Sequence, residues 1–182
     1  MKEISLNILD VAKNSIRANA TNVTVSLFTD SDGWLTLTIK DNGCGMSEDV
    51  LAHVTDPFYT TRTTRKVGLG LPLLKMATEQ TGGHLELTSS TKDADHGTTL
   101  SAVFNTKSID CMPMGDIVST VCILIAGSPD IDIEFSDISD THSVSLNTAQ
   151  LREVLGGISL AEPEVQVWIK EYLEEQYSEN KN

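Results

Sequence analysis

Four polar side chains lie along one side of the first predicted helix, residues 4–18. Asn7, Asp10, Asn14 and Arg17 recur at spacings of three, four and three residues, so helical geometry stacks them on one face. An amide oxygen such as that of Asn14 is a suitable hard ligand for Mg²⁺, and a carboxylate one turn earlier can deprotonate a water or a hydroxyl. The stripe therefore predicts a metal ligand, a base and a cation on one helix. The plainer interpretation of Asp10 is an ordinary exposed aspartate.

Two glycine-containing segments could bind a nucleotide beside this helix. In residues 41–46, Asp41 ends a predicted strand directly before two glycines, and such a carboxylate accepts a hydrogen bond from the exocyclic amine of adenine. In residues 68–72, a glycine pair precedes a predicted helix whose free N–H groups attract phosphate. Each motif alone is usually an ordinary turn. With the polar stripe they predict ATP and Mg²⁺, with Asp10 activating the group that attacks the γ-phosphate and Arg17 reaching the phosphates.

Five segments in this order resemble the N, G1, F, G2 and G3 boxes of the GHKL ATPase superfamily. That superfamily groups histidine kinases, DNA gyrase, mismatch-repair MutL and heat-shock chaperone ATPases on the Bergerat fold. The resemblance covers residues 1 to about 106 and implies an α+β fold, a two-layer α/β sandwich. The segments are the helix with Asn14, then residues 41–46, 56–62, 68–71 and 97–99.

The resemblance also implies a role for each matched position. Asp41 would recognise the adenine amine, and Thr98 would support it through water. Asn14 would bind Mg²⁺. The other nucleotide contacts would be Gly43, Gly45 and Met46 around the base, Arg17 at the phosphates, and Thr60, Lys66, Gly68, Leu69, Gly70 and Leu71 in an ATP lid.

The resemblance is divided between branches of the superfamily. Asp10 stands where hydrolysing members and anti-sigma-factor serine kinases carry an acidic base, whereas classical histidine kinases usually have an amide. Phe58 and Gly70 are most similar to sensor histidine kinases, and residues 14–21 also resemble the mismatch-repair branch. A histidine kinase carries its phosphoacceptor on a helix before the N box, but here the N box begins almost at Met1. The four histidines are expected at the surface or in loops: His53, His84, His96 and His142.

Hydrophobic periodicity predicts the elements that position these residues. A mostly antiparallel sheet covered on one face by helices is expected up to Lys107, followed by a small α/β extension. Residues 55–69 are polar and irregular, as in a binding loop or lid. The apolar stripe of the last helix is expected to pack on the same chain, with a partner surface the less favoured alternative. This stripe consists of Val165, Trp168, Ile169, Tyr172 and Leu173. Helices are predicted over residues 4–18, 47–54, 72–80, 116–126, 149–155 and 164–176, and strands over 23–27, 35–39, 84–89, 98–105, 131–135 and 143–146.

Charge and composition exclude several classes of protein. The 182 residues include 26 acidic and 13 basic side chains, a net charge of −13, whereas proteins that bind nucleic acids neutralise phosphates with basic surfaces. The longest apolar stretch, around residues 121–127, is far shorter than the roughly 20 residues that span a bilayer. No secretory signal is recognisable at the start. Three cysteines without a CxxC spacing favour a reducing cytoplasm.

The charge divides the chain into two expected segments. Residues 1–107 hold 12 acidic and 10 basic side chains, whereas residues 108–182 hold 14 and 3. The second segment, an acidic α/β extension, could complete the core, form a homodimer or present a docking surface for a protein partner. Cys111, Met112 and Met114 suggest a soft-metal site, but a free thiol and two core thioethers are the favoured interpretation.

Two functions remain open on this basis. In the first, the chain is an Mg²⁺-dependent ATP-binding protein that hydrolyses ATP or transfers its γ-phosphate to a separate protein partner, with Asp10 as the base. In the second, ATP is a regulatory ligand whose lid closure changes how the acidic extension binds another protein, with negligible catalysis.

Overall fold

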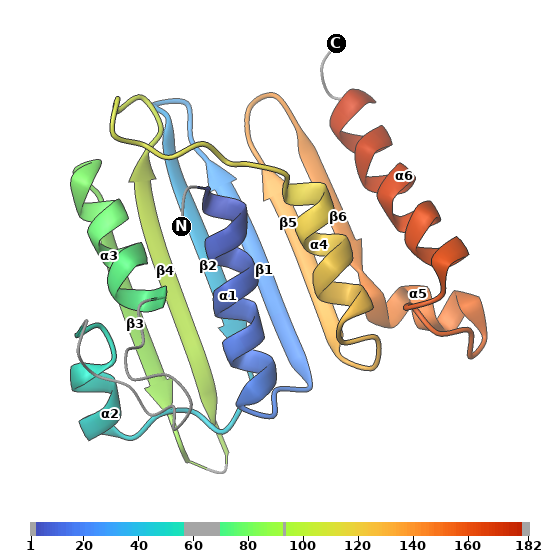
Figure 1. The fold of residues 1–182 in the computed structure, drawn as a ribbon, viewed down its shortest axis with the longest axis horizontal. Coiled ribbons are helices and arrows are strands. Elements are labelled where there is room, and N and C mark those ends of the chain that lie inside the picture. Colours follow the sequence, from blue (N-terminus) through green and yellow to red (C-terminus); the bar gives the residue numbers. More distant parts are fainter. Residues whose placement is uncertain (1–2, 57–69, 93, 180–182) are drawn as a thin grey trace.

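A single six-stranded sheet runs through the molecule (Figure 1). The computed structural model describes residues 3–56, 70–92 and 94–179. Within these residues the strand order is β3-β4-β2-β1-β5-β6, and β1 and β5 are parallel while every other neighbouring pair is antiparallel. The strands are β1 (Asn22–Thr29), β2 (Trp34–Asp41), β3 (His84–Ser90), β4 (Gly97–Asn105), β5 (Asp132–Ile138) and β6 (Ser143–Asn147).

Helices cover one face of this sheet, with α1, α3 and α4 in front of the strands and α6 at the β6 end (Figure 1). Val23, Val25 and Leu27 of β1 are fully buried and alternate with more exposed residues, as in a strand with one covered face. The predicted two-layer α+β sandwich is confirmed. The helices are α1 (Ile4–Arg17), α2 (Glu48–His53), α3 (Gly70–Gln80), α4 (Ile117–Ala126), α5 (Thr148–Leu155) and α6 (Pro163–Glu179).

Side-chain caps explain where several helices begin. Ser47 accepts a hydrogen bond from the Val50 N–H at the start of α2, and Asp116 accepts one from the Ser119 N–H at the start of α4. The hydrogen bonds from the N–H and the hydroxyl of Ser119 hold the pKa of Asp116 below its ordinary value. The predicted start of the third helix at Pro72 is wrong by two residues: α3 begins at Gly70, and the proline occupies its first turn, where no intrahelical N–H is needed.

The residues after Lys107 continue the same sheet. β5 lies parallel to β1, with Asn22 paired to Asp132, and β6 forms the outer edge. The chain that leads into α4 also contacts α1, because the carbonyls of Pro113 and Met114 accept hydrogen bonds from the N–H groups of Ile4 and Ser5. These first N–H groups of a helix have no partner inside it, so the extension completes the start of α1.

A buried polar cluster anchors the end of α6. The Tyr177 hydroxyl donates a hydrogen bond of 2.7 Å to Asp137 on β5, and the His142 ring lies 3.0 Å from the same carboxylate. Burial, followed by the bond to Asp137, raises the pKa of Tyr177. His142 lies in the loop between β5 and β6, in agreement with the expectation for the histidines, and it is half-buried there.

The apolar stripe predicted for the last helix is divided in the structure. Val165, Ile169 and Leu173 are buried, but Trp168 and Tyr172 remain exposed. The expectation that the whole stripe packs on the chain is therefore wrong for the two aromatic residues. A helix against the edge of a sheet buries one row at i, i+4 and i+8, and the neighbouring row stays outside.

Near the linker to α4, the sulfur groups pack into the protein. The Met112 sulfur accepts a hydrogen bond from the Asn7 amide, and the Cys111 thiol donates one to the Met112 carbonyl. Burial raises the pKa of Cys111. Over the described parts of the chain, no group of three or more His, Cys, Asp or Glu side chains could hold a metal ion, and no helix is long and apolar enough to cross a bilayer.

Candidate functional site

A buried carboxylate lies at the centre of the candidate site. Asp41 ends β2 and is only 9% exposed. Its Oδ1 accepts hydrogen bonds from the N–H groups of Gly43 (2.8 Å) and Thr98 (3.2 Å), and its Oδ2 accepts one from the Ser15 hydroxyl (2.6 Å). A carboxylate has about four acceptor positions, so the donors of the described residues leave one on Oδ2 for a further donor. The three donors fix the orientation of the group.

Ser15 was not predicted from the sequence as part of the site. It follows Asn14 on α1, and it is 5% exposed. Its bond to Asp41 joins the helix that carries Asp10 and Asn14 directly to the carboxylate. A hydroxyl in the last turn of an amphipathic helix has no distinctive sequence pattern, so only the spatial position of Asp41 reveals this role.

The loop after β2 is held against α1 and the β3–β4 hairpin. Asn42 accepts hydrogen bonds from the N–H groups of Thr21 and Asn22, and the Cys44 N–H donates to the Ala18 carbonyl. Gly45 has a φ of +69°, and a Cβ there would lie 1.9 Å from the Ser90 carbonyl oxygen. Only glycine fits this close approach.

A second hydroxyl, that of Ser89 on β3, connects the loop to β4. It accepts a hydrogen bond from the Met46 N–H (2.8 Å), donates to the Gly97 carbonyl (2.9 Å) and lies 2.8 Å from the Thr98 hydroxyl. Ser89 is paired with Thr98 across the two strands. An alternation pattern alone would place it on an ordinary strand, so sequence reasoning missed it.

His96 adds a further contact that the sequence did not predict. Its ring Nδ1 lies 2.7 Å from the Gly43 carbonyl. Gly43 is buried, and a Cβ on it would lie about 3 Å from both Ala18 and the Asp41 carboxylate. The predicted base-pocket residues Gly43, Gly45 and Met46 therefore lie in the loop that follows Asp41, and Ser89 connects this loop to Thr98 on β4.

The polar stripe of α1 separates into two parts. The Arg17 guanidinium donates a hydrogen bond of 3.2 Å to the Asn14 amide oxygen at the exposed end of the helix. Asn7, in contrast, is 1% exposed and donates to the Glu3 carbonyl and the Met112 sulfur. Asn7 is thus a packing residue at the extension, although it shares the helix face with the others.

The Asp10 side chain, on α1, lies beside the first residue of α3. A Cβ on Gly70 would be 2.2 Å from the Asp10 Oδ2 oxygen, so this carboxylate occupies the space that a side chain would need. The N-terminus of a helix carries unpaired N–H groups and the positive end of the dipole. Two motifs that are 60 residues apart in the sequence, the stripe and the second glycine pair, therefore meet in space.

Among the described residues, the structure brings predicted site residues together in small groups. Asp10 adjoins Gly70 in the first turn of α3, where Leu71 also lies, and Asn14 adjoins Arg17. Asp41 adjoins Gly43 and Thr98. Four predicted lid residues lie outside the described residues: Thr60, Lys66, Gly68 and Leu69.

Such an arrangement can bind a ligand that carries a hydrogen-bond donor at one end and a negative charge at the other. The free acceptor position of Asp41 suits an N–H donor on a planar base, and the start of α3 suits an anion. Between them Asp10 and Asn14 offer hard oxygen atoms, which suit Mg²⁺ when phosphate oxygens complete its coordination. The residues present therefore fit a bound magnesium nucleotide.

Comparison with known proteins identifies the group to which this fold belongs. Residues 2–108 match the family model described as histidine kinase-, DNA gyrase B-, and HSP90-like ATPase. The chain belongs to this ATPase family. The resemblance to the GHKL superfamily that the five motifs predicted is confirmed. The matched range contains every candidate site residue and ends where the acidic extension begins.

Curated relatives of this ATPase-family chain include a sensor protein and a sporulation kinase. It is 52% identical over 54 residues to the C4-dicarboxylate transport sensor protein DctB of Pseudomonas aeruginosa, covering 29% of this chain and 9% of that protein. It is 33% identical over 91 residues to sporulation kinase E of Bacillus subtilis, covering 49% of this chain and 12% of that protein. The chain therefore spans a small part of the length of these relatives.

Solved structures share the fold over a longer range. The Aquifex aeolicus MutL ATPase domain complexed with ADP aligns with a TM-score of 0.57 at 12% identity, covering 86% of this chain and 70% of that one. The N-terminal domain of a DNA repair protein aligns with a TM-score of 0.57 at 14% identity, covering 81% of this chain and 52% of that one. Both alignments exceed the share that residues 1–107 could supply, so the likeness in fold includes part of the extension.

Proposed function

We propose that this chain binds ATP with Mg²⁺ and either hydrolyses it or transfers the γ-phosphate to a separate protein. The observation that carries the proposal is the position of the Asp10 carboxylate at the N-terminus of α3, beside Gly70 and on the same helix as Asn14. A base beside an anion-binding helix start is placed to act on a group that attacks a bound phosphate. The family membership and the ADP complex of the MutL structure support a nucleotide as the ligand.

Each residue has a proposed task in this reaction. Asp41 accepts a hydrogen bond from the adenine amine through the open position on Oδ2, and Ser15 and Thr98 hold that carboxylate in place. Asn14 supplies an amide oxygen to Mg²⁺, which neutralises charge on the phosphates when bound. Asp10 accepts the proton of the attacking water or hydroxyl. Arg17 leaves Asn14 to contact the phosphates.

An experiment with labelled nucleotide tests this proposal. The purified protein is incubated with γ-labelled ATP and Mg²⁺, alone and with host lysate, and label is followed as free phosphate or on protein. Asp10→Asn should keep ATP affinity and lose turnover by at least about a hundredfold, in the range expected for removal of a general base. Asp140→Asn, at the exposed tip of the β5–β6 hairpin, is the matched control. Unchanged turnover in Asp10→Asn would remove this residue from the mechanism.

A second function is favoured by the contacts between α1 and the extension. The first N–H groups of α1, the helix that carries Asp10 and Asn14, donate hydrogen bonds to the carbonyls of Pro113 and Met114. The Asn7 amide of the same helix donates one to the Met112 sulfur. A nucleotide that shifts α1 would therefore act on the extension directly, as in a regulatory module with negligible catalysis. The same experiment separates the two functions. Label that stays on ATP, with wild-type binding intact, would favour the module.

A further inference from the structure

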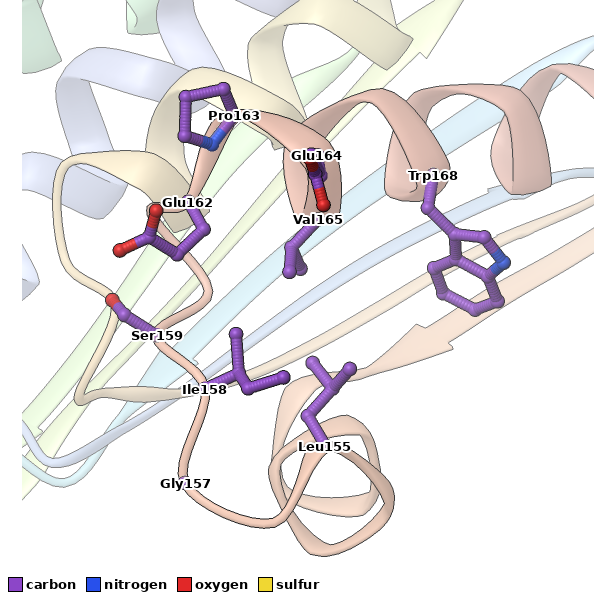
Figure 2. A pocket seen from close by; sticks show the side chains of 9 residues that line it. All are labelled: Leu155, Gly157, Ile158, Ser159, Glu162, Pro163, Glu164, Val165 and Trp168. Atoms are coloured by element: carbon purple, nitrogen blue, oxygen red, sulfur yellow. The ribbon is translucent and has the colours of Figure 1, made fainter.

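An open groove lies between α6 and the chain that follows α5, far along the sheet from the candidate site (Figure 1, Figure 2). It has a volume of about 910 Å³. Figure 2 shows the side chains of Leu155, Ile158, Val165 and Trp168 directed into the space between the loop and the first turns of α6. Val165 is buried at the base of the groove, whereas Ile158 is 53% exposed and Trp168 is 47% exposed, so the described chain leaves these two apolar side chains largely uncovered.

The aromatic residues beside the groove are held in place before any partner arrives. Trp168 and Tyr172 are one turn apart on α6, and their rings stack with centroids 5.1 Å apart and an angle of 9° between planes. Stacking restricts both side chains, so little conformational entropy remains to be lost on binding. Exposed Trp and Tyr side chains of this kind are typical anchors of protein interfaces.

Carboxylates border this apolar floor. Glu162 and Glu164 line the groove itself. Helical spacing places Glu171 and Glu175 on the same side of α6 as the aromatic pair, and both are exposed. Residues 153–179 contain seven carboxylates and one ammonium group, that of Lys170. Lys170 forms an ion pair with Glu174, which does not line the groove. The carboxylates at the groove border therefore keep their negative charge.

We propose that this groove is the docking site for a basic amphipathic segment of a protein partner. Aliphatic side chains of that segment would fill the space beside Ile158 and Val165, and arginine guanidinium groups would contact Glu162 and Glu164 and stack on Trp168. A second copy of this chain is a poor occupant, because it would bring another acidic surface against this one. Docking here requires neither ATP nor its turnover.

A single-tryptophan protein provides the direct measurement. The chain has two tryptophans, so Trp34→Phe leaves Trp168 as the sole reporter beside the groove. The probe is a capped helical peptide of about 15 leucine and arginine residues, with leucine at i, i+3 and i+4 spacing. The control peptide has glutamate in place of every arginine. The expected result is a blue shift of Trp168 emission with the basic peptide and none with the acidic one, weakening as salt increases.

Matched variants separate docking from general charge attraction. Glu162→Gln with Glu164→Gln should weaken peptide binding about tenfold, as should Ile158→Ser. The controls remove two carboxylates and one apolar side chain elsewhere: Glu48→Gln with Asp49→Asn on α2, and Val154→Ser, whose wild-type side chain is 84% exposed and does not line the groove.

Four outcomes would overturn the proposal. In the first, the basic peptide does not bind, and in the second, the double variant on α2 weakens peptide binding as much as the double variant at Glu162 and Glu164. In the third, Ile158→Ser binds the peptide with unchanged affinity. In the fourth, the protein alone forms a dimer that Ile158→Ser dissociates. Asp41→Asn should bind the peptide as the wild type does, because docking in the groove does not depend on the nucleotide. The peptide experiment therefore tests the groove even where the proposed nucleotide binding fails.

Discussion

Replacing Asp41 by asparagine tests the proposed base recognition most directly. Two backbone N–H groups, those of Gly43 and Thr98, donate to Oδ1 and cannot reorient, so the amide oxygen of the new side chain in Asp41→Asn would take that position. The new NH₂ group then replaces Oδ2. The Ser15 hydroxyl can rotate and accept from it, which keeps the fold intact. The open position now carries a donor instead of an acceptor.

The size of the effect follows from these contacts. A hydrogen bond to a buried charged group contributes about 1.5–3 kcal/mol, and a donor left facing the adenine amine costs about 1–3 kcal/mol more. The sum of about 3–6 kcal/mol corresponds to a loss of ATP affinity of about 10²- to 10⁴-fold. Inosine triphosphate, which presents a carbonyl in place of the amine, should lose far less, because its oxygen accepts from the new NH₂ group.

Calorimetric titration of ATP and inosine triphosphate against wild type and variant measures both quantities. Circular dichroism and urea unfolding show whether the variant is folded, and Asp32→Asn in the exposed β1–β2 turn is the control. A folded variant whose ATP affinity falls by less than about threefold would refute the assigned role of Asp41. Equal losses for the two nucleotides would refute the base recognition while leaving a general structural role.

Three further predictions concern other contacts. Gly70→Ala places a Cβ 2.2 Å from the Asp10 carboxylate, so turnover should fall at least about tenfold with ATP affinity nearly unchanged, measured by phosphate release and calorimetry against Gly127→Ala. Tyr177→Phe removes the hydrogen bond to buried Asp137 and should cost about 1–3 kcal/mol in urea unfolding, unlike exposed Tyr172→Phe. Because the pKa of Tyr177 is raised from 10.0, its contribution is complete below pH 10 and is lost as the pH rises further, a loss that Tyr177→Phe should not show. Asp116→Ala removes the cap of α4 and should lower the free energy of unfolding by about 0.5–2 kcal/mol at pH 7. The pKa of Asp116 in the folded protein lies below its ordinary value of 3.8, so the wild type should be more stable than the variant above pH 3.8. Thermal unfolding should show this difference in stability disappear as the pH falls through the pKa of Asp116 in the folded protein.

Local patterns predicted most of the elements. The helical spacing of apolar residues located α1, alternation located the β1–β2 hairpin, and Ser47 and Asp116 marked helix starts that the structure shows. Asp41 was also recognisable, because a carboxylate at a strand end before two glycines is an unusual combination. These features depend on neighbours within a few residues, so the sequence displays them directly.

The remaining features depend on residues that are distant in the chain. Nothing local indicates that β5 pairs with β1, because the paired residues are far apart in the sequence. Ser26 and Ser136, for example, share a hydrogen bond across these strands and are 110 residues apart. Ser15 and Ser89 became part of the site only because folding brought them to Asp41 and Thr98. The sequence by itself determined the family, the elements and the central carboxylate. The tertiary structure decided which hydroxyls support that carboxylate, that Asp10 meets the start of α3, and that Trp168 stays exposed beside an acidic groove, because each of these depends on which surfaces pack together.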